Sequence, residues 1–270
     1  MRLQMMTGAL AALVLSAGTA FAQDACPKPA MPQWRDAWAL AVTWQPGFCD
    51  SFNTKNRSLP KECPVASKLD TFTLHGLWPQ WEEYCIASPA RAEACDLKRD
   101  EMPEVRLSPD LARRLAAIMP GVQSQLERHE YFKHGTCSGL PQEAYFDLAI
   151  GLTEKLNRST LPGFLQQHVG GNVTKRQLCD AVEKALGTQA RAAVEADHKT
   201  VRGDNGERRF YLVELRFWLK PAGGKLDLAA ENFLPVKSGA KTLGPVPADA
   251  LCDDNLDKHV YYIDRPGMGR

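Results

Sequence analysis

Eight cysteines behind an N-terminal export signal constrain the fold of this chain more than any other feature of its sequence. Arg2 precedes an almost wholly small or apolar stretch from Met5 to Ala17, and Ala20 to Ala22 forms the A-x-A pattern at which signal peptides are cleaved. We expect residues 1–22 to be a signal peptide that is removed after Ala22, which predicts a periplasmic or secreted protein. A buried N-terminal helix is the alternative for this segment.

All eight cysteines lie beyond that cleavage site, and an even number of cysteines in an exported chain predicts disulfides. The sequence has no C-x-x-C pair, which argues against structural zinc and against a thioredoxin-like site. Because the cysteines crowd into the first half, we expect that half to be rich in loops held by disulfides. Spacing alone does not choose among the possible pairings.

Hydrophobic periodicity predicts that residues 23–270 form one α+β domain. Alternating apolar residues indicate strands over residues 38–44, 70–77 and 211–219. Helical spacing covers residues 108–118, 123–134, 174–187 and a segment that begins near Pro141. These strands are not regularly interleaved with helices, which favours a central, largely antiparallel β-sheet flanked by helices. No linker, repeat or charge block divides the domain.

The balance of acidic and basic residues limits how strongly such a protein can bind nucleic acid by net charge. The chain has 33 Lys and Arg residues against 32 Asp and Glu residues, and residues 1–22 contain Arg2 but no acidic residue. The mature chain would therefore be neutral, which argues against a protein that coats long nucleic acid by broad electrostatic attraction.

Outside the N-terminus no apolar run approaches the roughly 20 residues that span a bilayer, so we expect no membrane segment.

Two short segments contain three of the six histidines. The first reads F-T-L-H-G-L-W-P over residues 72–79, and its Gly76 and Pro79 are typical of a strand end. We therefore expect His75 at a strand terminus beside a turn. The second reads H-E-Y-F-K-H-G-T-C over residues 129–137.

The ionisable residues of the second segment share one face of a helix that turns by about 100° per residue. They are His129, Glu130, Lys133 and His134. An ordinary solvated helix face is the alternative for such a group. A metalloprotease H-E-x-x-H site is disfavoured, because His129 and His134 diverge by about 140° on the helix. Imidazoles, a carboxylate and a lysine suit acid–base transfer at a phosphate, for which the 2′-hydroxyl of RNA is a built-in nucleophile.

At these residues the sequence resembles the ribonuclease T(2) family of secreted ribonucleases, and within it the periplasmic bacterial members. Both family segments are present in the right order, as L-H-G-L-W-P and H-E-x-x-K-H-G-T-C. The resemblance implies that His134 is the general base for the 2′-hydroxyl and His75 the general acid for the departing 5′-oxygen. It also implies that Glu130 and Lys133 stabilise the phosphorane and that His129 helps to hold the phosphate.

The tryptophan and tyrosine residues near the first segment are candidates for base recognition. Trp78 is similar to the family's tryptophan that contacts a base or ribose, or it is a core residue by the turn. Trp81 and Tyr84 either complete a base pocket or merely pack. Gln80 stands where fungal members carry an acid implicated in base preference, so that preference does not transfer.

The resemblance implies an endoribonuclease that needs no metal ion or other cofactor and has low base specificity. Single-stranded RNA would be cleaved to a 2′,3′-cyclic phosphate and then to a 3′-phosphate, while DNA, which lacks the nucleophile, would be spared. We expect a monomer that grips only a few nucleotides. The alternatives are a catalytically silent RNA-binding or partner-binding protein on the same fold and a metal-dependent phosphodiesterase.

The family also guides the disulfide prediction, because it commonly joins the cysteine after the second segment to one that follows the first. For Cys137 that implies Cys95 or Cys85, of which we favour Cys95. A local loop favours Cys49–Cys63, and a shared downstream position favours Cys179–Cys252. Cys26–Cys85 is then left by elimination.

Overall fold

The computed structural model describes residues 36–52, 58–86, 97–202, 207–235, 251–252, 256 and 260–266. The expected signal peptide, Cys26, Cys95 and the first residues of the mature chain lie outside the described residues. Within the described part of the chain, no helix is both long enough and apolar enough to cross a membrane.

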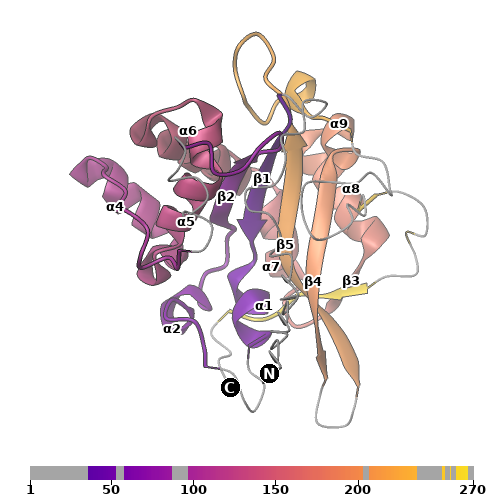
Figure 1. The fold of residues 1–270 in the computed structure, drawn as a ribbon. Coiled ribbons are helices and arrows are strands. Elements are labelled where there is room, and N and C mark those ends of the chain that lie inside the picture. The colour runs from indigo at the N-terminus through magenta and orange to yellow at the C-terminus, as the bar shows by residue number, and fades with distance from the viewer. Residues whose placement is uncertain are drawn as a thin grey trace, which may run out of the picture.

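A six-stranded sheet forms the centre of the molecule, with β2, β1, β5 and β4 side by side (Figure 1). The strands are β1 (Trp38–Thr43), β2 (Thr73–Pro79), β3 (Asn172–Thr174), β4 (Val194–Arg202), β5 (Arg208–Leu219) and β6 (Val260–Tyr262). One edge of β5 pairs with β4, and its other edge pairs with β1 and, near Tyr211, with β6. All pairings are antiparallel except β5 with β6, which confirms the expected α+β fold with a largely antiparallel sheet.

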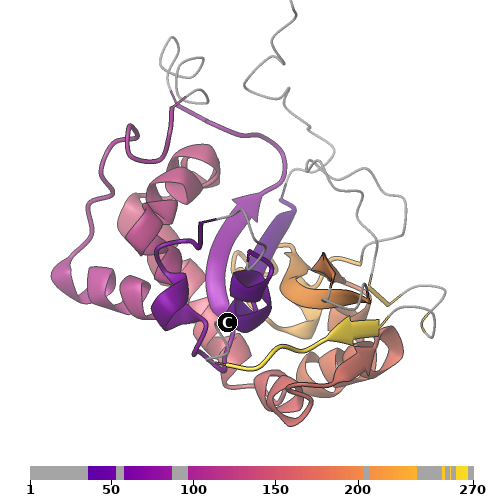
Figure 2. The same cartoon turned by 90° about the horizontal axis from the view of Figure 1, so that it is seen from below.

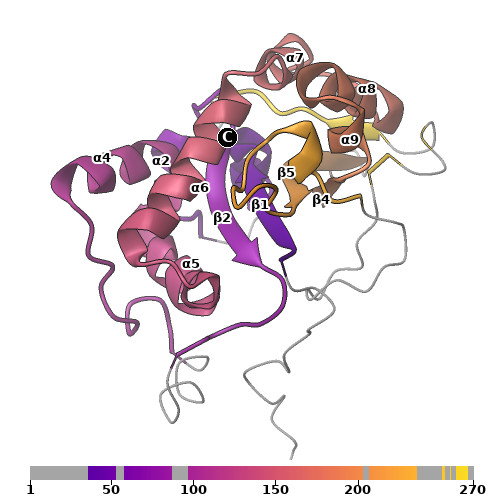
Figure 3. The same ribbon diagram turned by 90° about the horizontal axis from the view of Figure 1, so that it is seen from above.

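Helices flank the sheet in two groups. They are α1 (Gln45–Asp50), α2 (Cys63–Ala66), α4 (Pro109–Ile118), α5 (Leu126–Lys133), α6 (Gln142–Asn157), α7 (Leu161–Gln167), α8 (Lys175–Leu186) and α9 (Thr188–Arg191), with 3₁₀ turns η2 (Pro120–Ser124), η3 (Gly135–Ser138) and η4 (Ala230–Asn232). Views from below and above show α4, α5 and α6 on the side of β2 and α7, α8 and α9 on the side of β4 and β5 (Figure 2, Figure 3). The site described below lies where α5 meets β2.

Local sequence signals account for the starts of several helices. Thr174 and Gln177 form a full capping box at the start of α8, which ends before Gly187 as expected. The single helix predicted over residues 123–134 is wrong at its start, because Pro120–Ser124 forms a 3₁₀ turn. Gln125 then has a left-handed φ of 56°, so α5 begins one residue later, at Leu126.

The two faces of the sheet differ, because directly opposed residues of antiparallel strands point to the same side. One face is apolar: Trp38, Leu40 and Val42 of β1 lie opposite Leu219, Phe217 and Leu215 of β5, and all six are buried in the main core. The other face places Ala39, Ala41 and Thr43 opposite Trp218, Arg216 and Glu214. The second face therefore carries charged side chains on a central strand, beside small residues on its neighbour.

Three disulfides join parts of the described chain, and two of them confirm the expected pairs Cys49–Cys63 and Cys179–Cys252. The expected pairs Cys95–Cys137 and Cys26–Cys85 are wrong, because Cys85 bonds Cys137, with the two Cα atoms 4.8 Å apart. The backbone explains this choice. The amide of Tyr84 donates to the carbonyl of Lys133 at 2.8 Å, and the amide of Cys85 donates to Thr136 Oγ1 at 3.1 Å. These two hydrogen bonds hold Cys85 next to η3, which contains Cys137.

Candidate active site

His75 lies in the middle of β2 at a β-bulge. The expected strand terminus is wrong, because β2 continues through Gly76 to Pro79. Gly76 is opposite Ala41 and Leu74 is opposite Val42, which leaves His75 without a partner on β1. A bulge turns a side chain away from the regular alternation. In a regular strand residues three apart point to opposite faces, whereas here the rings of His75 and Trp78 meet edge to face at 5.1 Å.

Gly76 allows α5 to approach β2 closely. A Cβ atom on Gly76 would lie 2.1 Å from Glu130 Oε2 and 2.3 Å from Trp78 Nε1. Those two atoms hydrogen-bond each other at 2.6 Å, with the indole N–H donating to the carboxylate. A side chain at position 76 would clash with these atoms, so the position requires glycine. The carboxylate of Glu130, from the second sequence segment, occupies the space that a Cβ atom would take.

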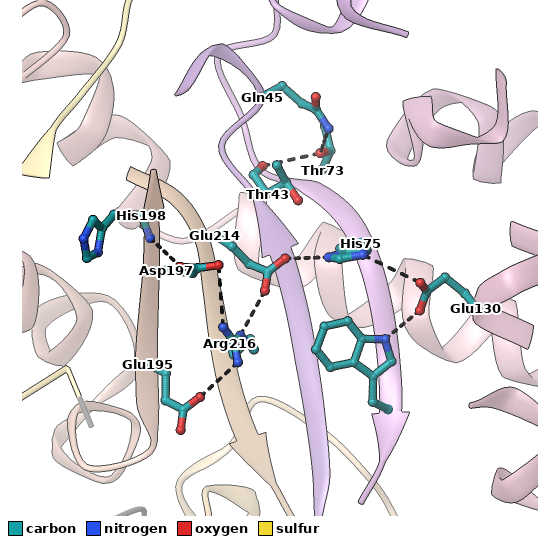
Figure 4. Close-up of polar contacts among 11 residues, drawn as sticks. Thr43, Gln45, Thr73, His75, Glu130, Glu195, Asp197, His198, Glu214 and Arg216 are labelled. Carbon is teal, nitrogen blue, oxygen red and sulfur yellow. Dashed lines mark hydrogen bonds and ion pairs between the residues drawn. The ribbon is translucent and has the colours of Figure 1, made fainter. Parts of the chain in front are cut away.

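Glu130 is the most deeply buried ionisable group of α5, at 1% exposure. Its Oε1 lies 3.7 Å from His75 Nε2, so the carboxylate contacts both the imidazole and the indole of β2 (Figure 4). Burial raises the pKa of Glu130, against the opposing effects of His75, the Trp78 hydrogen bond, Lys133 and Arg99. The opposite side of α5 is anchored by Tyr131, which packs on Tyr145 and Phe146.

The remaining residues of the second segment complete the site around Trp78. The buried His134 ring is 5.3 Å from the Trp78 ring, and the His129 ring is 6.5 Å from that of His134. Burial lowers the pKa of His129 to about 4, with help from the positive charges of Lys133, Arg99 and His75. Lys133 Nζ is 3.7 Å from Glu83 Oε1. The structure thus brings together the five polar residues and the tryptophan that the two segments predicted.

Sequence reasoning missed Glu214 on β5, whose Oε2 lies 2.5 Å from His75 Nδ1 (Figure 4). Burial lowers the pKa of His75, but attraction by Glu214, the hydrogen bond to Glu214 and attraction by Glu130 outweigh it and raise the pKa to about 9. Burial likewise raises the pKa of Glu214, but His75 and Arg216 outweigh it, and the net shift is downward. The available signal was Glu214 and Arg216, two residues apart in the stretch 210–219, whose other members are aliphatic or aromatic.

The side chains of Trp81 and Tyr84 pack against other aromatic and apolar side chains, although the backbone amide of Tyr84 donates to the carbonyl of Lys133. Tyr84 is 5% exposed and forms a small cluster with Met102, next to Phe132. Trp81 is half-buried and meets the ring of Trp38 edge to face at 5.5 Å. Packing is the alternative that the sequence left open for both residues, and their surroundings favour it.

The arrangement suits proton transfer in two directions. One imidazole, His75, is held in its charged form between two carboxylates, while His129 is held neutral. The ring of His134 lies 5.3 Å from that of Trp78 and supplies another ring nitrogen within the same cluster. An imidazolium and a separate imidazole near one buried carboxylate can donate and accept protons at one reacting group. The arrangement of these groups is suited to acid–base catalysis.

The comparison with known proteins makes the assignment specific. The model of the Ribonuclease T2 family matches residues 35–222, and the chain belongs to that family. Ribonuclease I of Escherichia coli strain K12 is 32% identical over 223 residues, which cover 74% of this chain and 81% of that protein. A ribonuclease of Aeromonas hydrophila is 33% identical over 120 residues, or 44% of this chain and 46% of that protein.

A solved structure has the same fold. The self-incompatibility-associated SF11-RNase of Nicotiana alata aligns with a TM-score of 0.52 over 85% of this chain and 98% of its own, at 18% identity. The family resemblance expected from the two histidine segments is therefore confirmed, and the protein is an endoribonuclease.

Proposed function

We propose that this enzyme cleaves single-stranded RNA by attack of the 2′-hydroxyl on the adjacent phosphate, without a metal ion or other cofactor. The observation that carries the proposal is the placement of two imidazoles, those of His75 and His134, against the ring of Trp78 beside the buried Glu130. The ring of His75 lies 5.1 Å and that of His134 5.3 Å from the ring of Trp78, and attraction by two carboxylates keeps His75 charged. Transphosphorylation needs two such groups near one phosphate, because one group must accept a proton while another donates one.

In this mechanism His134 accepts the proton of the 2′-hydroxyl, and His75 donates a proton from Nε2 to the departing 5′-oxygen. A pKa of about 9 keeps His75 charged at neutral pH and so ready to donate. Glu130 and Lys133 stabilise the phosphorane. His129, with its pKa lowered to about 4, contacts the phosphate as a neutral hydrogen-bonding group rather than as a cation. Trp78 contacts a base or ribose with the part of its ring that stays exposed.

The products in this proposal are a 2′,3′-cyclic phosphate and, after slower hydrolysis, a 3′-phosphate. DNA is spared because it has no 2′-hydroxyl. Base specificity is low, and the enzyme acts as a monomer that binds a few nucleotides at a time.

Mass analysis of products from dinucleoside monophosphates in EDTA tests these steps together. The expected result is a cyclic phosphate that appears first and a 3′-phosphate that follows, with deoxy analogues uncut. Activity that disappears in EDTA and returns with a divalent ion would instead indicate a metal-dependent phosphodiesterase. RNA binding without cleavage would indicate a catalytically silent protein. Undiminished cleavage by a His75→Ala, His134→Ala double variant would overturn the assigned roles.

We also propose that the protein is exported and that residues 1–22 are cleaved as a signal peptide. Three disulfides in the described chain support a mature protein that resides in an oxidising compartment. N-terminal sequencing of protein recovered from the periplasm or medium should begin at Gln23. Recovery only from the reducing interior of the cell, with an intact N-terminus, would contradict export.

A further inference from the structure

The bond between Glu214 and His75 spans two strand positions of the sheet. His75 belongs to β2 and Glu214 to β5, and β1 lies between them. On β1 the residue opposite Glu214 is Thr43, and its neighbour on the same face is Ala41. Both are small, so the carboxylate reaches across β1 to His75 Nδ1 at 2.5 Å (Figure 4). A bulge on each side of this connection, at His75 and at Val213, sets the two side chains toward each other.

Glu214 is itself fixed by Arg216. Arg216 Nε lies 2.9 Å from Glu214 Oε1, which leaves Oε2 for the imidazole. The same guanidinium contacts two carboxylates of β4, Glu195 at 3.5 Å and Asp197 at 3.9 Å. Three carboxylates around one arginine leave an excess of negative charge, and an imidazolium next to them reduces that excess. The Glu214 side chain is 9% exposed, so the water that would screen this attraction is largely absent.

The ionisable groups around His75 come from several elements. Glu214 and Arg216 face it from β5, Glu130 and His129 from α5, and Arg99 from the segment before α4. The two carboxylates stabilise the imidazolium, while Arg99 opposes it. Of the two carboxylates, only Glu214 hydrogen-bonds the ring, since Glu130 stays 3.7 Å from Nε2.

We propose that Glu214 is a positioning residue for the cleavage step: it accepts the Nδ1–H of His75 and so directs the transferable proton on Nε2 toward the substrate. The partner of one ring nitrogen decides which proton the other can give, and it also fixes the plane of the ring. Arg216 holds Glu214 in place for this task. The inference rests on the proposed role of His75 as general acid, and it adds a residue from outside the two sequence segments to the reaction.

Glu214→Gln tests this role, because glutamine keeps the size of the side chain and removes its charge. Two substrates are compared: a dinucleoside monophosphate, whose leaving oxygen needs a proton, and uridine 3′-(4-nitrophenyl phosphate), whose leaving group does not. A general acid contributes about 10²–10⁴-fold to a rate, so a misdirected one should cost roughly tenfold or more in kcat on the dinucleotide. KM on both substrates and kcat on the nitrophenyl ester should stay close to wild type, which also shows that the variant is folded.

NMR titration of His75 supplies a readout that does not depend on catalysis. In Glu214→Gln the pKa should fall from about 9 toward 6.5, and the alkaline limb of the dinucleotide pH–rate profile should move down with it. Glu214→Asp keeps the charge on a shorter side chain. Its His75 pKa and its kcat on the dinucleotide should therefore lie between those of wild type and those of Glu214→Gln. Asp197→Asn is the matched control: it removes a carboxylate from the same arginine, and its other contact is to the backbone amide of His198. It should change both readouts much less.

A Glu214→Gln variant with wild-type kcat on the dinucleotide, or with equal losses on both substrates, overturns the proposal. So does an unshifted His75 pKa. His75→Ala distinguishes a failure of the Glu214 proposal from a failure of the proposed general-acid role of His75. If His75 is the general acid, kcat of this variant should be low on the dinucleotide and nearly normal on the nitrophenyl ester. If His75→Ala loses both activities alike, the general-acid role of His75 fails, whatever Glu214 does to the pKa.

Discussion

At the scale of single residues, the site contains two histidines whose pKa values move in opposite directions from the same ordinary value of 6.5. The His75 side chain is 34% exposed, and attraction by two carboxylates outweighs the effect of desolvation on its pKa. For His129, burial and three positively charged neighbours disfavour the protonated form and so lower the pKa. The difference is one of partners rather than of residue type, and it assigns a charged and a neutral imidazole to one small site.

These shifts predict opposite pH dependences of stability. Because the folded-state pKa of His75 is raised, its contribution is fully present below pH 6.5 and is lost as the pH rises through about 9. The contribution of His129 is fully present above pH 6.5 and is lost as the pH falls through about 4. Thermal melts should therefore show that His75→Gln is most damaging on the acidic side of its window. His129→Gln should flatten the acid-side decline of wild type, and parallel curves for all three proteins would contradict both shifts.

Gly76 offers a steric test at the same scale. In Gly76→Ala the new Cβ would enter the Trp78–Glu130 hydrogen bond, so we expect a loss of about 1–3 kcal/mol in the free energy of unfolding and a marked loss of activity. Gly151→Ala in α6 is the control, because a Cβ at that position would meet no other atom within 4 Å. There alanine should stabilise by about 0.5–1 kcal/mol. Urea denaturation measures both, and equal effects at the two positions would contradict the steric argument.

At the scale of secondary structure elements, the site depends on how α5 is held against β2. α5 has eight residues, and isolated helices shorter than about 12–15 residues are marginal in water. The contacts of Tyr131 with α6, the Trp78–Glu130 bond and the Cys85–Cys137 disulfide compensate for that shortness. The disulfide closes η3, immediately after α5, onto the segment that follows β2. It therefore acts on the relative position of the two sequence segments.

Removal of that disulfide should affect stability and activity together. A Cys85→Ser, Cys137→Ser variant is expected to lose about 2–5 kcal/mol of stability and to show a lower kcat even at temperatures where it remains folded. The Cys179–Cys252 bond joins α8 to the C-terminal region, far along the chain from both segments. Its removal should cost a similar amount of stability with little change in kcat. Denaturation curves paired with kinetics at low temperature distinguish the two, and a normal kcat in the first variant would argue against the coupling.

At the scale of the whole molecule, the balance of 33 basic and 32 acidic residues fits an enzyme whose positive charge is local. Around the site the described chain offers Lys133, Arg99 and the charged His75, together with several carboxylates. Such a surface attracts one or two phosphates rather than a long strand. The proposed binding of a few nucleotides follows from this distribution.

The salt dependence of kcat/KM tests that distribution. Single-stranded nucleic acid gives a slope of about −0.7 per phosphate contact in a plot of log affinity against log salt. We expect about −1 to −2 for this enzyme, for a long homopolymer and a short oligonucleotide alike. A slope of about −5 or steeper on the polymer alone would reveal an extended cationic track and contradict a local distribution of positive charge.

Features that depend on neighbouring residues could be predicted from the sequence: the capping box of α8, the helical face that carries Glu130 and Lys133, and the two segments that define the family. Spacing along one element fixes which side chains share a face, so these features follow from local geometry. The tertiary structure alone decided the rest. His75 lies on a bulge that exists only in pairing with β1, and Cys85 was chosen over Cys95 by backbone contacts with the end of α5. Glu214 comes 139 residues after His75 and meets it only because β5, β1 and β2 are neighbours in the sheet. Local sequence therefore predicted the proposed reacting groups, while strand pairing brought Glu214 to His75 and so set the charge environment of its ring.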